Sequence, residues 1–459
     1  MVPDLALLEI FDLYMAEALG HDPFRHNREA WIILAHVCRK WRDIVFGSPY
    51  RLNVRLHFTS RRSVRVMLDT WRWPPLPIDI WGLGLGEWNV NNIVAALEQT
   101  DRIHKIQLCD SSLFHLEQAF AAMQRPFPSL TELAVNFYGE KAMAVPDLFL
   151  SGSAPLLRSL RLRCTRFPPP LLRHLLLSTT DLVELRIWRI PDSGFIPPEA
   201  MIACLSGLNR LEEFELGFQS PRFWRSRHLP RSPRCVLPAL TSLLFNGSCE
   251  YLEDLIAPID SPLLDNLDVI VFHQPELDTT QFAQFVDRTP KLKPLHEAHI
   301  IFGSIHVFVS LPRTPHRGLH FRVTVMPLYQ LSVMVRLCTS SFLRTLIPMM
   351  RRLYILNSGA VEGSQWLDLL RPFTTVQDLY LSQKIPPHIV PALYGTIGEG
   401  MMEALPSLQN LFLEKKFPGP VEEVIGQFVA ALRLSSRPIA VSQWGRVHDP
   451  WWLHELEDR

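Results

Sequence analysis

Few residues of this sequence have the types and spacing that catalysis requires. Gly82, Gly84 and Gly86 are spaced as in a phosphate-binding loop, but no Gly-Lys-Ser/Thr follows them, so a plain loop is the better interpretation. His296 and His299 are too close together for a zinc-binding helix, and on a strand they would point to opposite faces. No Gly-x-Ser-x-Gly motif is present. We therefore expect a binding protein without catalytic residues, metal or cofactor.

Composition and charge narrow the classes of partner and compartment. The 46 Lys and Arg balance the 46 Asp and Glu, so no net charge directs the chain toward nucleic acid. The longest mostly apolar window, 300–311, is shorter than the roughly 18 residues of a membrane span, and no basic leader is apparent. The 7 cysteines are scattered, which fits reduced thiols. We expect a cytoplasmic or nuclear protein that binds neither nucleic acid nor membrane.

A repeated apolar pattern runs through most of the chain. The spacing apolar-x-x-apolar-x-apolar recurs at intervals of 24 to 32 residues, apart from one interval of 55, which is typical of slightly stretched leucine-rich repeats. The copies begin at Ile103, Leu130, Leu157, Leu182, Leu211, Leu240, Leu264, Leu295, Met350, Val376 and Leu408. A degenerate strand at 319–325 fills the long interval, and strands at 52–58 and 76–81 begin the array.

Helical patterns lie between the predicted strands. The stretches 170–178, 198–205, 280–287 and 421–432 are each apolar on one helical face. Strands and helices that alternate with a fixed period predict an α/β solenoid over residues 51–445, like an irregular leucine-rich-repeat horseshoe with parallel strands on its concave face. An ordinary α/β sheet would not produce so many near-regular copies of one motif.

A small helical module precedes the repeats. Leu7, Ile10 and Phe11 have the spacing of one helical face, and a second apolar pattern covers 31–45 before a Gly-Ser-Pro sequence ends it. A bundle of about fifty residues is too small to be very stable alone. We therefore expect residues 1–50 to pack against a partner or against the rest of the chain.

The motif in this module is Pro3-x3-Leu7-x2-Ile10-Phe11, followed by His-Val-Cys-Arg-Lys-Trp-Arg-Asp-Ile at 36–44 and by Ser48-Pro49. Together these residues resemble an F-box, in the form found in the leucine-rich-repeat F-box families of mushroom-forming fungi. The resemblance implies that the module binds a Skp-type adaptor and a cullin in an SCF-type ubiquitin ligase. The residues it implies for the adaptor-binding surface and the core behind it are Pro3, Leu7, Ile10, Phe11, Val37, Cys38 and Trp41.

Three positions depart from the F-box pattern. Val2 stands in place of the usual leucine, Leu5 in place of an acidic residue, and Tyr50-Arg51 in place of Leu-Trp. The expected function is therefore that of a substrate-recognition subunit of the ligase, and the alternative is a protein-interaction scaffold whose drifted F-box does not engage it. For Val37 and Trp41, packing within the bundle is an alternative to contact with the adaptor.

Outward-facing strand positions place a basic and aromatic cluster on neighbouring strands. Its members are Arg161, Arg163, Arg186 and Trp188. Strands lie about 4.8 Å apart, so these side chains would be close enough to bind an acidic or phosphorylated segment of a protein substrate. The alternative is a set of solvated arginines neutralised by Glu184 and Glu213.

A second candidate substrate surface is an aromatic stripe. Tyr354, Tyr380 and Phe412 occupy equivalent positions on successive predicted strands, where they would anchor apolar side chains of a substrate. The alternative is that the tail at 446–459, which carries Trp451-Trp452, covers the stripe. A solenoid end must be capped to remain soluble, so we expect the tail to act as this cap.

Overall fold

The computed structural model describes most of the chain as two compact units, Met1–Ile196 and Pro197–Arg459. The described residues are 3–19, 30–49, 51–59, 64–70, 75–83, 90–139, 143–220, 234–272, 277–292, 298–302, 306–314, 317–324, 335–338, 340–355, 366, 369–382, 405–414, 423, 426–427, 430 and 439–444. Several expectations lie outside them, wholly or in large part: Val2, Tyr50, Gly84, Gly86, His296, the helix at 421–432 and the tail at 446–459.

The first unit begins with a helical module. Its helices are α1 (Asp4–Leu19), α2 (Ala30–Val37) and α3 (Arg39–Gly47). Phe11, Trp31 and Val45 are at most 1% exposed and form its core. The Cys38 side chain accepts a hydrogen bond from the Trp41 backbone N–H and so caps the start of α3.

A parallel sheet follows the module. Its strands are β1 (Leu56–Thr59), β2 (Ile78–Leu83), β3 (Ile103–Asp110), β4 (Glu132–Phe137), β6 (Ser159–Arg163) and β8 (Glu184–Ile190). Each pairs with the next in chain order. The connections include α4 (Val64–Thr70), α5 (Val90–Leu97), η1 (Thr100–Arg102), α6 (Leu113–Ala122), η2 (Phe149–Gly152), α7 (Pro169–Ser178), η3 (Asp192–Gly194) and the small pair β5 (Met143–Ala144) and β7 (Thr165–Arg166).

The second unit repeats this arrangement with a larger sheet. Its strands, in spatial order, are β9 (Glu213–Phe218), β11 (Ser242–Gly247), β13 (Asn266–Val271), β16 (Arg317–Thr324), β15 (His306–Thr314), β14 (Ala298–Phe302), β17 (Met350–Ile355), β18 (Asp378–Leu381), β19 (Asn410–Glu414) and β20 (Ala440–Trp444). The remaining elements are α8 (Pro198–Leu205), β10 (Cys235–Val236), α9 (Cys249–Ile256), β12 (Ile259–Asp260), α10 (Thr280–Arg288), η4 (Pro290–Leu292), α12 (Ser341–Leu346) and η6 (Ile347–Met349).

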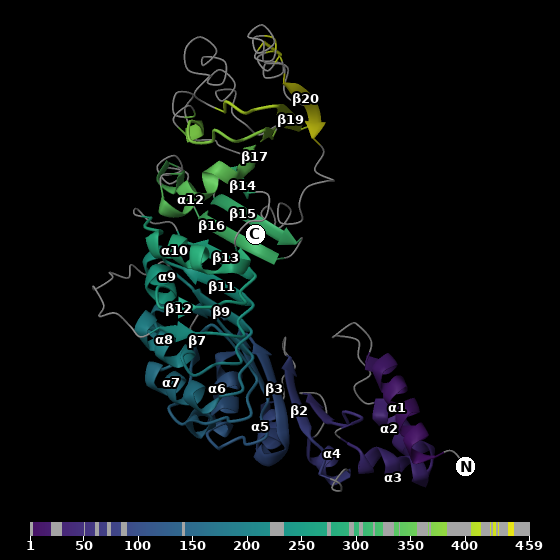
Figure 1. Cartoon of the computed structure of the whole chain (residues 1–459). Helices are drawn as coiled ribbons and strands as arrows, with labels where there is room; N and C mark the ends of the chain where they lie inside the picture. The colour runs from purple at the N-terminus through teal and green to yellow at the C-terminus, as the bar shows by residue number, and fades with distance from the viewer. Residues whose placement is uncertain are drawn as a thin grey trace. The chain divides into compact units, whose positions relative to one another are not determined.

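The predicted α/β architecture with a mostly parallel sheet is confirmed. In each unit the connecting helices lie along one side of the strands (Figure 1). The repeated apolar residues form the core between the two layers: Leu133, Leu160 and Leu185 are at most 1% exposed. Residues alternate between the two faces of a strand, so each buried leucine leaves its neighbour on the opposite, polar face.

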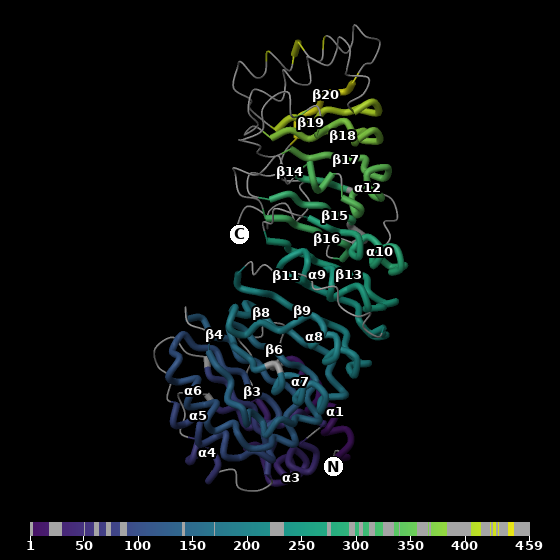
Figure 2. Tube along the Cα trace, turned by 90° about the vertical axis from the view of Figure 1, so that its left-hand side faces the viewer, coloured from purple at the N-terminus to yellow at the C-terminus, as the bar shows by residue number. Residues whose placement is uncertain are grey.

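One part of the predicted strand order is wrong. We expected the strands at 295–300 and 319–325 to follow 264–269 as consecutive parallel members. Instead β14, β15 and β16 form an antiparallel meander. The meander folds back, so that β16 pairs with β13 and β14 pairs with β17 (Figure 2). Short connections join these three strands, and short connections favour antiparallel neighbours over parallel ones.

Candidate functional site

The residues implied for adaptor binding separate into a core set and a surface set. Leu7 and Phe11 are buried at 6% and 0% exposure. Trp41 is half-buried, and its ring meets that of Phe11 edge-on with centroids 4.7 Å apart. These three side chains therefore hold α1 against α3 and do not themselves form an exposed apolar surface.

The other implied residues lie on the surface of the module. Pro3, Ile10, Val37 and Cys38 are all exposed, with Ile10 at 52% and Val37 at 55%. The structure thus places Val37 outside the bundle core, contrary to the packing alternative for this residue, whereas the half-buried Trp41 ring packs against Phe11. The exposed position of Val37 is compatible with contact to a partner.

Sequence reasoning missed further exposed apolar residues on the same helices. Leu5 and Leu13 of α1 are each 72% exposed, and Ile33 of α2 is 53% exposed. Their signal is helical spacing: Leu5 and Leu13 lie on the side of α1 opposite Leu7 and Phe11. Large apolar side chains concentrated on one small module are typical of an interaction surface.

Arg51, one of the departures from the F-box pattern, has a structural role. Its Nε donates to the Asp12 carboxylate at 2.9 Å, and its guanidinium also pairs with Glu9. The hydrogen bonds to Asp12 and Glu9 raise the pKa of Arg51. Trp31 adds a second link, because its indole N–H donates to the Arg55 carbonyl at 3.1 Å. Both links hold the helical module against the start of the first sheet.

The structure brings the predicted arginine cluster together. Arg161 and Arg186 lie directly opposite each other on β6 and β8, as do Arg163 and Trp188. The Arg163 guanidinium lies over the ring of Tyr138, 5.3 Å from its centroid, and Tyr138 is 56% exposed. The predicted adjacency is therefore present, with Tyr138 as a member that sequence reasoning did not include.

Glu184 occupies the centre of this cluster. Its carboxylate accepts hydrogen bonds from Arg161 Nε, Arg161 Nη2 and Ser159 Oγ, each at 2.7 Å, and it also forms an ion pair with Arg186. Burial raises the pKa of Glu184, but the hydrogen bonds and the two positive charges outweigh burial and hold the pKa below its ordinary value. The geometry therefore agrees with the alternative in which Glu184 neutralises the arginines.

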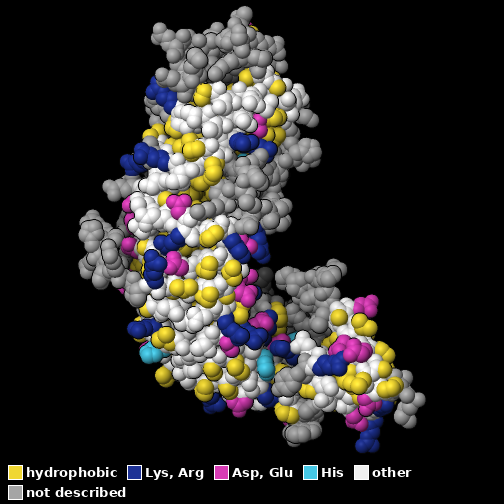
Figure 3. All heavy atoms as spheres, in the orientation of Figure 1, with side chains coloured by type: hydrophobic (Ala, Val, Ile, Leu, Met, Phe, Trp, Pro, Cys, Tyr) yellow, Lys and Arg dark blue, Asp and Glu magenta, His cyan; other side chains and the backbone are white. Residues whose placement is uncertain are grey.

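Cross-strand ion pairs continue along the same strand positions of the first sheet. Arg55 pairs with Asp79 at 3.1 Å, and Lys105 pairs with Glu132. Burial raises the pKa of Asp79, although the charge of Arg55 opposes that effect. On the side of the molecule that Figure 3 shows, basic and acidic side chains lie next to one another. The outward face of the first sheet is thus polar, and its basic and acidic side chains pair with one another. Such a surface suits contact with a protein more than capture of a strongly charged ligand.

The aromatic stripe is also present and is partly covered from within the chain. Tyr354, Tyr380 and Phe412 lie in register on β17, β18 and β19, with ring centroids 4.3 and 4.4 Å apart and interplanar angles of 14° and 8°. Trp444 of β20 meets Tyr380 edge-on at 5.4 Å. Tyr354 is 3% exposed and Trp444 is 7% exposed. Among the described residues, Trp444 therefore supplies part of the cover that we had assigned to Trp451-Trp452.

A serine and a histidine meet inside the antiparallel meander. Ser310 Oγ lies 3.1 Å from His320 Nδ1, across neighbouring strands. Ser310 is fully buried, and burial together with the charge of Arg322 lowers the pKa of His320 to about 4. A histidine of that pKa is a weak base at neutral pH, so the pair lacks both the access and the basicity that nucleophilic catalysis requires.

Two further features concern metals and membranes. Within the residues that the structure describes, no three His, Cys, Asp or Glu side chains are grouped so that they could hold a metal ion. Across the same residues, no helix combines the length and the apolar run that crossing a bilayer demands.

Compared with known proteins, the sequence matches no protein-family model, and no curated protein matches it at a significant level.

Proposed function

We propose that this chain is the substrate-recognition subunit of an SCF-type ubiquitin ligase. In this proposal α1 to α3 form an F-box that binds a Skp-type adaptor and through it a cullin. The α/β repeats, as an irregular leucine-rich-repeat solenoid, bind a protein substrate. The assembly would act in the cytoplasm or the nucleus. The chain would do no chemistry itself, because holding a substrate near the ligase is sufficient to raise the rate of transfer.

The observation that carries the proposal is the exposed apolar surface of α1 and α2. Leu5, Ile10 and Leu13 on α1 and Ile33 and Val37 on α2 are each more than half exposed. Leaving such partly exposed side chains in water forgoes about 1 to 2 kcal/mol for each one that a partner could bury. A helical partner with an apolar face would cover them, as in other helix-in-groove complexes.

The links between the module and the first sheet support the same function. The hydrogen bond from Trp31 to Arg55 and the ion pairs of Arg51 join the module to the strand region of the same unit. A receptor that works by proximity benefits from such a connection, because a fixed geometry limits the volume that a bound substrate explores.

The test is a binding measurement with a recombinant Skp-type adaptor. The double substitution Ile10→Ser/Val37→Ser should weaken binding by at least about tenfold and leave the melting temperature unchanged, because both side chains are exposed in the free protein. Leu177→Ser, at an equally exposed apolar position on α7, is the matched control and should bind as the wild type does. Equal affinity of the double variant and the wild type would contradict the proposal.

A second candidate function is a protein-interaction scaffold that does not join the ligase. The observation in its favour is that Arg51, at a departure from the F-box pattern, pairs with Glu9 and Asp12 of α1. A scaffold of this kind would co-purify with other proteins but with neither adaptor nor cullin. Affinity purification followed by mass spectrometry separates the two functions.

A further inference from the structure

One arginine on the outward face of the first sheet is not neutralised. The acidic side chains on this face are already engaged: Asp79 and Glu132 each pair with one basic side chain, and Glu184 pairs with two arginines. Arg163 of β6 forms no ion pair within the described part of the chain. Its positive charge is therefore available to a ligand.

Aromatic and uncharged side chains surround Arg163. Its guanidinium lies over the ring of Tyr138, 5.3 Å from the centroid, which fixes the position of the charged group. Trp188 lies directly opposite Arg163 on β8, and Asn136 lies directly opposite it on β4. Asn136 carries no charge and donates a hydrogen bond to Cys109 Sγ at 3.4 Å. The residues paired with Arg163 on both neighbouring strands therefore leave its charge uncompensated.

Holding Arg163 in this position destabilises the free chain. Its Nε atom is shielded from solvent and has no hydrogen-bond acceptor among the described residues. A charged group that loses water without gaining an acceptor raises the free energy of the folded state. A bound carboxylate would supply the missing acceptor, because a guanidinium can donate two parallel hydrogen bonds to it.

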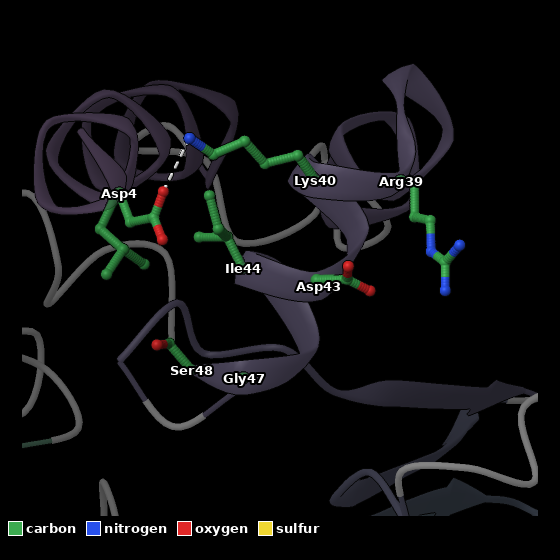
Figure 4. Close-up of a pocket in the computed structure, with 8 residues that line it drawn as sticks. Asp4, Arg39, Lys40, Asp43, Ile44, Gly47 and Ser48 are labelled. Atoms are coloured by element: carbon green, nitrogen blue, oxygen red, sulfur yellow. Dashed lines mark ion pairs between the residues drawn. The ribbon is translucent and has the colours of Figure 1, made fainter. Parts of the chain in front are cut away.

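The pocket between α1 and α3 offers no comparable surplus of charge. Lys40 pairs with Asp4 at 2.8 Å on one side of it (Figure 4). Arg39 and Asp43 also line the pocket, and both lie on the side of α3 away from Asp4 (Figure 4). Charges of both signs are thus balanced in its lining, whereas the charge of Arg163 is not balanced.

We infer that Arg163 binds an aspartate or glutamate side chain of the protein substrate. Tyr138, which is 56% exposed, and the half-buried Trp188 contact the apolar part of the same substrate segment. A carboxylate carries one negative charge, which matches the single guanidinium that Glu184 leaves free on β6. This inference rests on the proposed function, and it narrows the predicted arginine cluster to one residue that recognises the acidic group.

The test is peptide selection by the purified full-length chain. The probe is a random synthetic peptide library that contains phosphoserine as well as the ordinary amino acids. The wild type should enrich Asp and Glu, and the enrichment should decline at high salt. Arg163→Leu should reduce it about tenfold, since a hydrogen-bonded charge pair is lost. The melting temperature should be unchanged or raised, because the substitution removes a charged group without a partner.

Further variants separate the fork, the ring and the charge. Arg163→Lys keeps the charge but not the planar fork, so it should retain only part of the enrichment. Tyr138→Phe keeps the ring and should select peptides as the wild type does, whereas Tyr138→Leu should select them less well. Arg173→Leu removes an exposed arginine from α7, in the helical layer, and is the matched control that should change nothing.

The outcomes distinguish this inference from the proposed function. Equal acidic enrichment in Arg163→Leu and the wild type, no acidic enrichment in the wild type, or preference for phosphoserine over Asp and Glu overturns the assignment, and adaptor binding would still support the F-box proposal. If the chain selects acidic peptides through Arg163 but binds no Skp-type adaptor, the proposed function fails and the acidic-peptide site stands.

Discussion

Replacement of Tyr380 by alanine separates a structural role of the aromatic stripe from a binding role. The Tyr380 ring stacks on Tyr354 and Phe412 and meets Trp444 edge-on. Each such ring pair contributes about 0.5 to 1.5 kcal/mol beyond area burial. Loss of all three pairs from a half-buried position should therefore lower the free energy of unfolding by about 3 kcal/mol, below the upper range for a fully buried ring.

This loss should appear as a lower melting temperature and as faster amide exchange. For a unit of this size the expected shift is roughly 5 to 10 °C. In a repeat structure the damage should concentrate in neighbouring strands, so hydrogen exchange should accelerate in β17 to β20 and remain unchanged in β3 to β6. Tyr380→Phe keeps the ring and is the control. A Tyr380→Ala protein with an unchanged melting temperature and lost binding of co-purifying proteins would refute the structural role and restore the stripe as a substrate surface.

Two further predictions concern buried carboxylates. Burial raises the pKa of Glu253 from 4.5 to about 7, although the Gln281 and Phe282 backbone N–H groups oppose that shift; its stabilising contribution is therefore complete below about pH 4.5 and lost as the pH rises through 7. In urea titrations the free energy of unfolding of the wild type should fall by about 2 to 3 kcal/mol between pH 4.5 and pH 8 from this group, and Glu253→Gln, whose amide does not ionise, should lack that part of the pH dependence; parallel pH profiles would refute this assignment. The pKa of Glu184 is lowered, so its contribution is present above pH 4.5 and lost as the pH falls through the folded value. Glu184→Gln should lower the free energy of unfolding by about 1 to 3 kcal/mol at pH 7 and by less at pH 3. An equal loss at both pH values would show that pairing of the arginines with the Glu184 carboxylate does not stabilise the fold.

The repeated elements were predictable because their signals are local. The apolar spacing located the strands that carry Leu133, Leu160 and Leu185, all of which are buried. Strand residues alternate between faces, so a single stretch of sequence reveals which side chains enter the core. The same rule predicted that Arg161 and Arg186 would be neighbours, as would Tyr354 and Tyr380.

The pairing order of the central strands was not predictable in this way. β14 and β16 each carry an ordinary strand pattern, but such a pattern does not indicate which strand will be the hydrogen-bonded neighbour. Residues 306–314 were not predicted as a strand, because apolar side chains such as Val307 and Phe308 occupy both faces and are buried on both. A strand that is buried on both faces lacks the alternation of apolar and polar residues from which strands are predicted.

The sequence by itself determined the repeat period, the α/β class, the helical module and the neighbouring positions of the arginines and of the aromatic rings. Only the tertiary structure decided that Glu184 sits between Arg161 and Arg186 and that Trp444 covers Tyr380. It also decided that Lys40 meets Asp4 beside a pocket. Lys40 and Asp4, and likewise Tyr380 and Trp444, are far apart along the chain, and contacts of this kind depend on the distance and direction of side chains after folding. Periodicity specifies the face on which a side chain lies, whereas packing decides what it meets there.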